Sequence, residues 1–210
     1  MTTSAPISRC VITPPERVTS GRGAALWLLL GALAAGPAGA DCRDLAAPRA
    51  VPTAADGQWS LATFNLWRLR DTEKNSPIDR PLDDAVYQAR LDALAGYIVD
   101  TLKAPVLLAV QEVENLAILE QLAERVTAQG GPRYRARLLE GHDPAGMDVA
   151  LLHRAPAQVG GVRALFADQR FRGQPLFSRP PLAVSLTAPR ELTLVIVHLR
   201  SANGLGEKPW

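Results

Sequence analysis

A continuous apolar run at residues 105–110 (PVLLAV) is the feature that most constrains the fold of this chain. A strand without polar alternation must be covered on both faces, which is typical of the centre of an α/β sheet. Helical patterns flank this run on either side: apolar residues recur every three or four positions over 84–102 and again from Asn115 to about Gln129. The order predicts an α/β protein with helices packed on a central sheet.

The rest of the chain reads as short strands, rich in apolar and β-branched residues and separated by turns. Asp83 or Asp84 can cap the first helix, and Asn115 can cap the second. The polar stretch 71–82 contains two prolines and is expected to be a loop. Successive strands after a strand–helix–strand–helix segment indicate a mixed sheet. The expected strands are 59–66, 105–110, 133–140, 147–153, 157–165, 181–187 and 191–199.

The N-terminus has the pattern of an export signal. Residues 24–35 (AALWLLLGALAA) form a short apolar run, with Arg17 and Arg22 before it and small residues after it up to Ala40. This predicts a signal peptide at 1–40 and a periplasmic or secreted protein. An uncleaved membrane anchor is the alternative, although the run is short for a span. Residues 41–57 are expected to be a linker, and 58–210 a single domain.

Charge and cysteine content narrow the choice of partners. The formal net charge of +2 lies within residues 1–40, so the rest of the chain has 20 basic and 20 acidic residues. A broad basic coat for nucleic acid is therefore excluded, while a local basic groove stays open. After cleavage Cys42 is the one cysteine, which is either a free thiol or half of a disulfide whose partner lies further along a longer chain.

Two polar residues close predicted strands. Asn65 ends the first strand, and Glu112 follows the apolar run. If these strands are neighbours, both side chains emerge at the carboxyl edge of the sheet, where ligands of open α/β folds bind. An amide and a carboxylate oxygen suit Mg²⁺, Mn²⁺ or Ca²⁺. A turn asparagine and a helix-capping glutamate explain the same positions equally well.

Further candidates lie in the second half of the chain. His198 ends the most hydrophobic predicted strand, either as a core histidine or as a proton donor in the same crevice. Arg179 precedes another strand, where its guanidinium could bind phosphate or lie in solvent. Asp143 lies in the polar turn before the 147–153 strand, and Gly146 predicts that this turn is tight. Asp148 opens the strand, and a structural role in ordering the turn is at least as good an explanation for it as catalysis.

No nucleophile motif is present. The sequence contains no G-x-S-x-G, no P-loop and no zinc-type cysteine pattern. Without a nucleophile motif, the natural mechanism is direct attack by a water molecule that a metal or a base activates.

Five segments occur in a fixed order along the chain: LATFNLW, LLAVQEVEN, GHDPAGMDVALLHR, FSRPPL and LTLVIVHLRS. Together they resemble the endonuclease/exonuclease/phosphatase superfamily, which includes deoxyribonuclease I-like enzymes. The similarity covers about residues 59–203, and QEVEN is its most specific element.

The resemblance implies a four-layer α/β sandwich of two mixed β-sheets flanked by helices. It implies a divalent-metal-dependent phosphoesterase, with Glu112 and Asn65 at the metal and Arg179 on the substrate phosphate. His198 would stabilise or protonate the transferring group, and Asp143 lies where relatives often carry an acid. The substrate would be a phosphate ester, with DNA, RNA, lipids and sugar phosphates as candidates.

Two segments typical of that superfamily, Gly-Asp-x-Asn and Ser-Asp-His, do not occur in this sequence. They carry the groups that orient and activate the attacking water. A truncated domain is therefore expected, incomplete at its C-terminus, with the inner face of the first sheet uncovered, poor stability and impaired activity. Two alternatives are a non-catalytic pseudo-enzyme or partner-binding module, and a membrane-anchored interaction domain.

Overall fold

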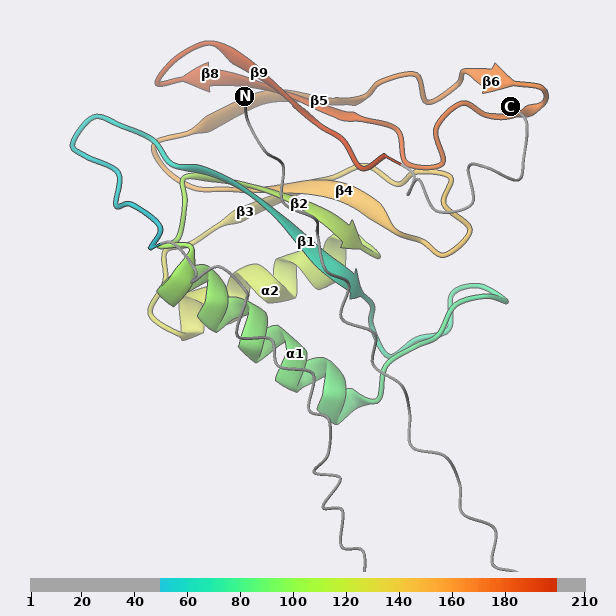
Figure 1. Ribbon diagram of the computed structural model, residues 1–210, viewed down its shortest axis with the longest axis horizontal. Helices are drawn as coiled ribbons and strands as arrows, with labels where there is room; N and C mark the ends of the chain where they lie inside the picture. The colour runs from blue at the N-terminus through green and yellow to red at the C-terminus, as the bar shows by residue number, and fades with distance from the viewer. Residues whose placement is uncertain (1–49, 200–210) are drawn as a thin grey trace, which may run out of the picture. The chain divides into compact units, whose positions relative to one another are not determined.

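The computed structural model describes residues 50–199 (Figure 1). The predicted signal peptide, Cys42 and most of the expected linker lie outside these residues. Ala50 to Ser60 contain no helix or strand. Within residues 50–199, no helix is long and apolar enough to cross a membrane.

The first sheet has the strand order β1-β2-β4-β3. Strands β1 and β2 are parallel, whereas β4 runs antiparallel to both β2 and β3. The apolar run 105–110 supplies β2, which lies between β1 and β4 as its composition predicts. The strand bounds are β1 Leu61–Leu69, β2 Leu107–Val113, β3 Arg135–Leu138 and β4 Asp148–His153.

The second sheet has the order β5-β8-β9 and is antiparallel. A two-stranded ribbon, β6 with β7, extends from the loop between β5 and β8 and was not predicted (Figure 1). Each of its strands has two residues, too few to show a hydrophobic period. The bounds are β5 Gln158–Ala164, β6 Arg170–Phe171, β7 Gln174–Pro175, β8 Leu182–Ala188 and β9 Leu192–Ile196.

Two helices pack on the outer face of the first sheet (Figure 1). Helix α1, Asp84–Gly96, begins at Asp83, whose side chain accepts a hydrogen bond from the Ala85 amide. The predicted single helix 84–102 continues past α1 as a π-helical turn, η2, Tyr97–Thr101. Helix α2, Leu116–Ala128, begins at Asn115, whose Oδ1 accepts from the Ile118 amide as predicted.

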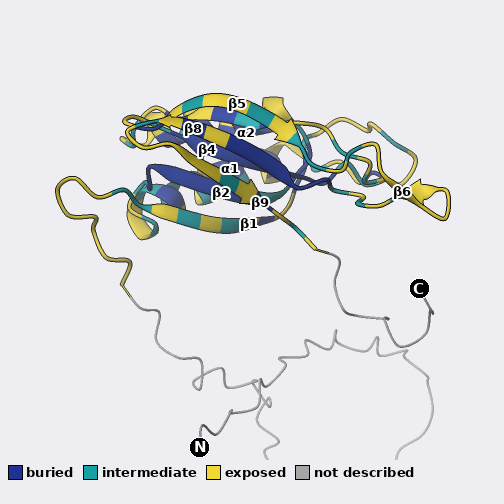
Figure 2. Cartoon of the chain, turned by 90° about the horizontal axis from the view of Figure 1, so that it is seen from above, coloured by how far each residue is buried: buried dark blue, intermediate teal, exposed yellow. Residues whose placement is uncertain are grey.

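The core has two layers, one on each face of the first sheet. The outer layer joins α1 and α2 to the sheet through residues such as Leu91, Leu119 and Leu152. The inner layer packs Leu107 and Leu151 against the second sheet. Strand β4 is buried along its whole length (Figure 2).

The expectation that the inner face of the first sheet is uncovered is therefore wrong for β2 and β4, whereas Leu61 and Thr63 of β1 stay exposed. Strands β5, β8 and β9 supply enough apolar side chains to cover β2 and β4, and their inward residues include Leu182, Val184, Leu186 and Ile196. The expectation assigned most of the second sheet to segments absent from the sequence. The α/β class and the face-to-face sheets are confirmed, with three layers of the sandwich among residues 50–199.

Candidate functional site

Backbone bulges present the two residues predicted at the metal. Strands β1 and β2 run parallel, and Asn65 pairs with Gln111, next to Glu112. The register shifts between Asn65 and Leu69 and between Gln111 and Val113, and Glu112 has a φ of 62°. Bulges re-aim side chains, and left-handed backbone in non-glycine residues concentrates at functional sites. Strand β2 thus continues through Glu112 to Val113 instead of ending before it.

Four of the five predicted site residues form one connected row. His198 Nε2 lies 3.5 Å from Glu112 Oε1. Arg179 Nη1 lies 2.9 Å from His198 Nδ1, and Arg179 Nε lies 3.4 Å from Asp143 Oδ2. The last pair is close enough for an ion pair but is not aligned as a hydrogen bond. Residues from four separate segments of the chain therefore meet at the carboxyl end of β2.

The row fixes the protonation of His198. A guanidinium can only donate, so Nδ1 of His198 must accept from Arg179 and the ring proton lies on Nε2, toward Glu112. Burial and Arg179 lower the pKa of His198, against the opposing effects of Glu112 and Asp143. The imidazole is thus neutral near pH 7, and its Nε2–H is available as a donor.

A close backbone approach brings Asp143 to Arg179. A Cβ on Gly141 would lie 2.6 Å from Asp148 Oδ1 and 3.1 Å from the Ser178 carbonyl, so only glycine fits here. The His142 amide donates to that same carbonyl at 2.7 Å. The loop before β4 is thereby fastened to the segment that carries Arg179.

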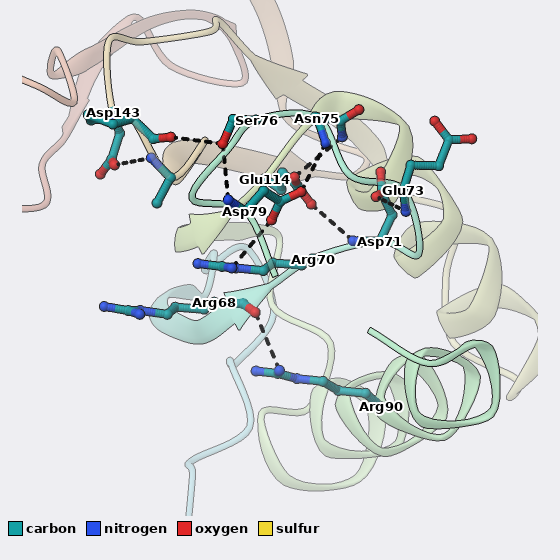
Figure 3. Close-up of polar contacts among 12 residues, drawn as sticks. Arg68, Arg70, Asp71, Glu73, Asn75, Ser76, Asp79, Arg90, Glu114 and Asp143 are labelled. Atoms are coloured by element: carbon teal, nitrogen blue, oxygen red, sulfur yellow. Dashed lines mark hydrogen bonds and ion pairs between the residues drawn. The ribbon is translucent and has the colours of Figure 1, made fainter. Parts of the chain in front are cut away.

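A buried glutamate that the sequence analysis missed supports this loop. Glu114 accepts from the Asp71 amide at 3.0 Å and from Asn75 Nδ2 at 3.4 Å (Figure 3). Ser76 Oγ donates to the Pro144 carbonyl at 3.3 Å, which ties the 71–82 loop to the Asp143 loop. Burial raises the pKa of Glu114. The second glutamate of QEVEN, two residues after Glu112, was the signal available in the sequence.

Asp148 orders the turn before β4, which is the structural one of the two roles that the sequence left open for it. Its Oδ1 accepts from the Gly141 amide at 2.9 Å, and the residue is buried. Burial, together with Glu140, raises the pKa of Asp148 to about 8. Gly146 has a φ of 70°, which confirms the tight turn. His153 is buried at the other end of β4, away from the row.

The donors at this edge fit a divalent cation that keeps much of its water. Glu112 offers a carboxylate and Asn65 an amide oxygen, and Mg²⁺ commonly takes one or two protein oxygens together with water and substrate phosphate. Asn65 Oδ1 already accepts from the Trp67 amide at 2.7 Å, which orients it. Among residues 50–199, no group of three or more His, Cys, Asp or Glu side chains could by itself hold a metal.

Comparisons with known proteins add little. No family model matches the sequence. No curated protein matches it. Among solved structures, a crystal structure of TDP2 from Caenorhabditis elegans is 19% identical with a TM-score of 0.40, and covers 58% of this chain and 33% of that one. A truncated form of TDP2 from the same organism is 18% identical with a TM-score of 0.44, and covers 69% and 47%. This chain thus spans less than half of either, and its site is assigned on its own geometry.

Proposed function

We propose that this chain carries a phosphate-ester site of the metal-dependent hydrolase type. The observation that supports it is the row Glu112–His198–Arg179–Asp143, in which two carboxylates, an imidazole and a guanidinium converge, with Asn65 on the strand paired to that of Glu112. Arg179 uses Nη1 and Nε within the row, which leaves Nη2 for an anion. An arginine held by its neighbours in this way is suited to bind a phosphate oxygen.

Each residue then has a defined task. Glu112 and Asn65 hold the cation, which when bound polarises a phosphate oxygen and stabilises developing charge. Asp143 neutralises and orients Arg179, and Arg179 binds the phosphate. His198 presents Nε2–H toward the same space, where it can donate to a phosphate or leaving oxygen. The substrate is a phosphodiester or phosphomonoester.

Cation binding is the first test. Purified full-length chain is titrated with Mn²⁺, and free Mn²⁺ is followed by its electron paramagnetic resonance signal. Glu112→Gln should weaken binding by roughly tenfold or more, because it removes the only charged ligand in the proposed set. The matched control Glu120→Gln changes an exposed glutamate on α2 and should bind as wild type. A folded wild-type chain that does not bind Mn²⁺ would rule out the proposal.

Turnover is the second test, with bis(4-nitrophenyl) phosphate as a small phosphodiester. Arg179→Gln should lower kcat by about a hundredfold or more, the usual effect of removing one preorganised donor. Arg125→Gln, which breaks an ion pair with exposed Asp92, should not. Turnover that persists in EDTA, or that Arg179→Gln does not slow, would contradict the assignment.

A partner-binding module without catalysis is the second candidate. It is favoured by exposed apolar residues along a groove of about 320 Å³ between β1 and β9, including Leu61, Val195 and Val197. Mn²⁺ binding that is lost in Glu112→Gln, together with no turnover of the phosphodiester, would support this candidate over the hydrolase.

Export is also part of the proposal, supported by the apolar run at 24–35 and the small residues up to Ala40. Mass spectrometry of the protein expressed from its full gene is the measurement. A mature chain beginning at Asp41 in the periplasm or medium is expected, and a membrane-bound chain that retains 24–35 would favour the anchor instead.

A further inference from the structure

A second hollow lies near the proposed phosphate-ester site, and the residues that line it have no role in that site. Its volume is about 460 Å³, and it is lined by Trp67, Arg68, Arg70, Arg80, Leu82 and Arg90. Four of the six lining residues are arginines, in a chain whose formal net charge is only +2. The first lining residue, Trp67, comes two residues after Asn65 in β1. Arg90 lies near Glu112: burial lowers the pKa of Arg90, and the Glu112 carboxylate partly opposes that effect.

The structure holds Trp67 out in solvent. Its side chain is 81% exposed, the most of any large apolar residue among 50–199. Trp67 and Arg68 both have left-handed backbone, with φ of 51° and 55°, a conformation unfavourable for residues other than glycine. Arg90 on α1 maintains it by donating to the carbonyls of Leu66, Trp67 and Arg68, and Figure 3 shows the contact with Arg68. The ring is thus presented by a braced, irregular end of β1, and its faces are free to stack.

Two arginines beside this ring, Arg68 and Arg80, are available to an anion, and Arg70 carries one buried donor without an acceptor. Arg70 is 6% exposed and donates to Asp79 at 3.3 Å, while its buried Nε has no hydrogen-bond partner within the described part of the chain. Arg68 and Arg80 are exposed, and neither has an ion pair with any of residues 50–199. Buried donors are almost always satisfied, so the free Nε of Arg70 indicates a missing acceptor.

We propose that this hollow, the Trp67 subsite, binds a nucleotide of single-stranded nucleic acid next to the scissile phosphate. Trp67 stacks on the base, and Arg68, Arg70 and Arg80 bind backbone phosphates. Aromatic rings interleaved with arginines are the usual platform for single strands, because every base has a face to stack and every linkage a charge. The inference rests on the proposed function, since it selects the substrate class of that site.

A membrane surface is less well matched by this hollow. Interfacial membrane binding uses a continuous apolar face rimmed by basic residues. Here one ring stands among arginines, and Leu82 is the other apolar side chain of the lining. A recess of this kind accepts one ring with charged phosphates around it.

The test is binding of fluorescein-labelled oligo(dT) to the full chain, followed by fluorescence anisotropy in EDTA. Trp67→Ala should weaken binding roughly 10- to 100-fold, the usual effect of losing one stacked base, and Trp67→Phe should recover most of it. The double variant R68Q/R80Q should lower the slope of log K against log salt by about 1.4, because two phosphate contacts are lost. Arg68 and Arg80 are exposed, so this variant should fold even if a change at Trp67 disturbs the loop.

Matched controls lie elsewhere on the surface. Phe171→Ala removes an exposed ring on β6, and R163Q/R190Q removes two exposed arginines from β5 and the β8–β9 turn. Both should bind oligo(dT) as wild type. Equal losses in the control and subsite variants would overturn the proposal, because the binding would then be diffuse.

Two further results would also overturn it. One is a folded wild-type chain that does not bind oligo(dT). The other is retention on phosphatidylglycerol vesicles that depends on Trp67 while oligo(dT) binding does not, which would identify a membrane surface instead. Because binding is measured in EDTA, its failure is distinct from failure of the proposed function, which is measured by Mn²⁺ binding and phosphodiester turnover.

Discussion

Arg90→Gln should destabilise the chain by about 2–3 kcal/mol, a large effect for a side chain on the surface of a helix. Arg90 donates to three consecutive carbonyls, at 2.7 Å to Leu66, at 3.3 Å to Arg68 and also to Trp67. Hydrogen bonds from charged donors contribute about 1.5–3 kcal/mol when buried, and about 1 kcal/mol each is reasonable for this half-buried position. Glutamine is too short to reach all three acceptors.

Urea unfolding at equilibrium, followed by far-ultraviolet circular dichroism, measures this loss. The comparison is Arg125→Gln, where a 2.6 Å ion pair joins half-buried Arg125 to exposed Asp92 and should contribute less than about 1 kcal/mol. The slope of free energy against urea should be unchanged in both variants. If Arg90→Gln costs no more than Arg125→Gln, Arg90 does not brace the left-handed residues after Asn65.

Two other perturbations test the core and the buried acid. The wild-type chain should lose about 2 kcal/mol of stability between pH 4 and pH 8, and Asp148→Asn should remove this loss. The folded pKa of Asp148 is raised to about 8, so the protonated acid stabilises the fold at low pH and this contribution is lost as pH rises. Exposed Glu140 turns to water and relieves part of the penalty. A wild-type melting temperature that does not fall over this range would contradict it. Leu151 lies between the two sheets, and Leu151→Ala should lower the free energy of unfolding in urea by about 3 kcal/mol. Leu192 is half-exposed, and Leu192→Ala should lower it by less than about 1 kcal/mol. Equal losses in the two variants would mean that the sheets are not packed as described.

Local patterns were sufficient for much of the fold. The unbroken apolar run predicted a strand covered on both faces, and β2 is that strand. The Asn115 cap was read correctly because capping depends on a few neighbouring residues. The choice of Asn65 and Glu112 needed only one further premise, that their two strands are neighbours, which the β1–β2 pairing confirms.

Other features depended on contacts between distant segments. Trp67, Arg68 and Glu112 adopt left-handed backbone that no local preference favours, so only the bulges and the Arg90 contacts could reveal it. The cover over β2 and β4 was missed because most of the second sheet was expected to come from segments absent from the sequence, whereas β5, β8 and β9 form a sheet by themselves.

The sequence by itself determined the α/β class, the helix starts and the residue types that could form a phosphate site, because these follow from composition and short-range spacing. Tertiary structure alone decided that His198, Arg179 and Asp143 form a row with Glu112. It also decided that Trp67 stands exposed among arginines. These facts depend on which residues far apart in the chain become neighbours when the two sheets pack, and spacing along the sequence does not contain that information.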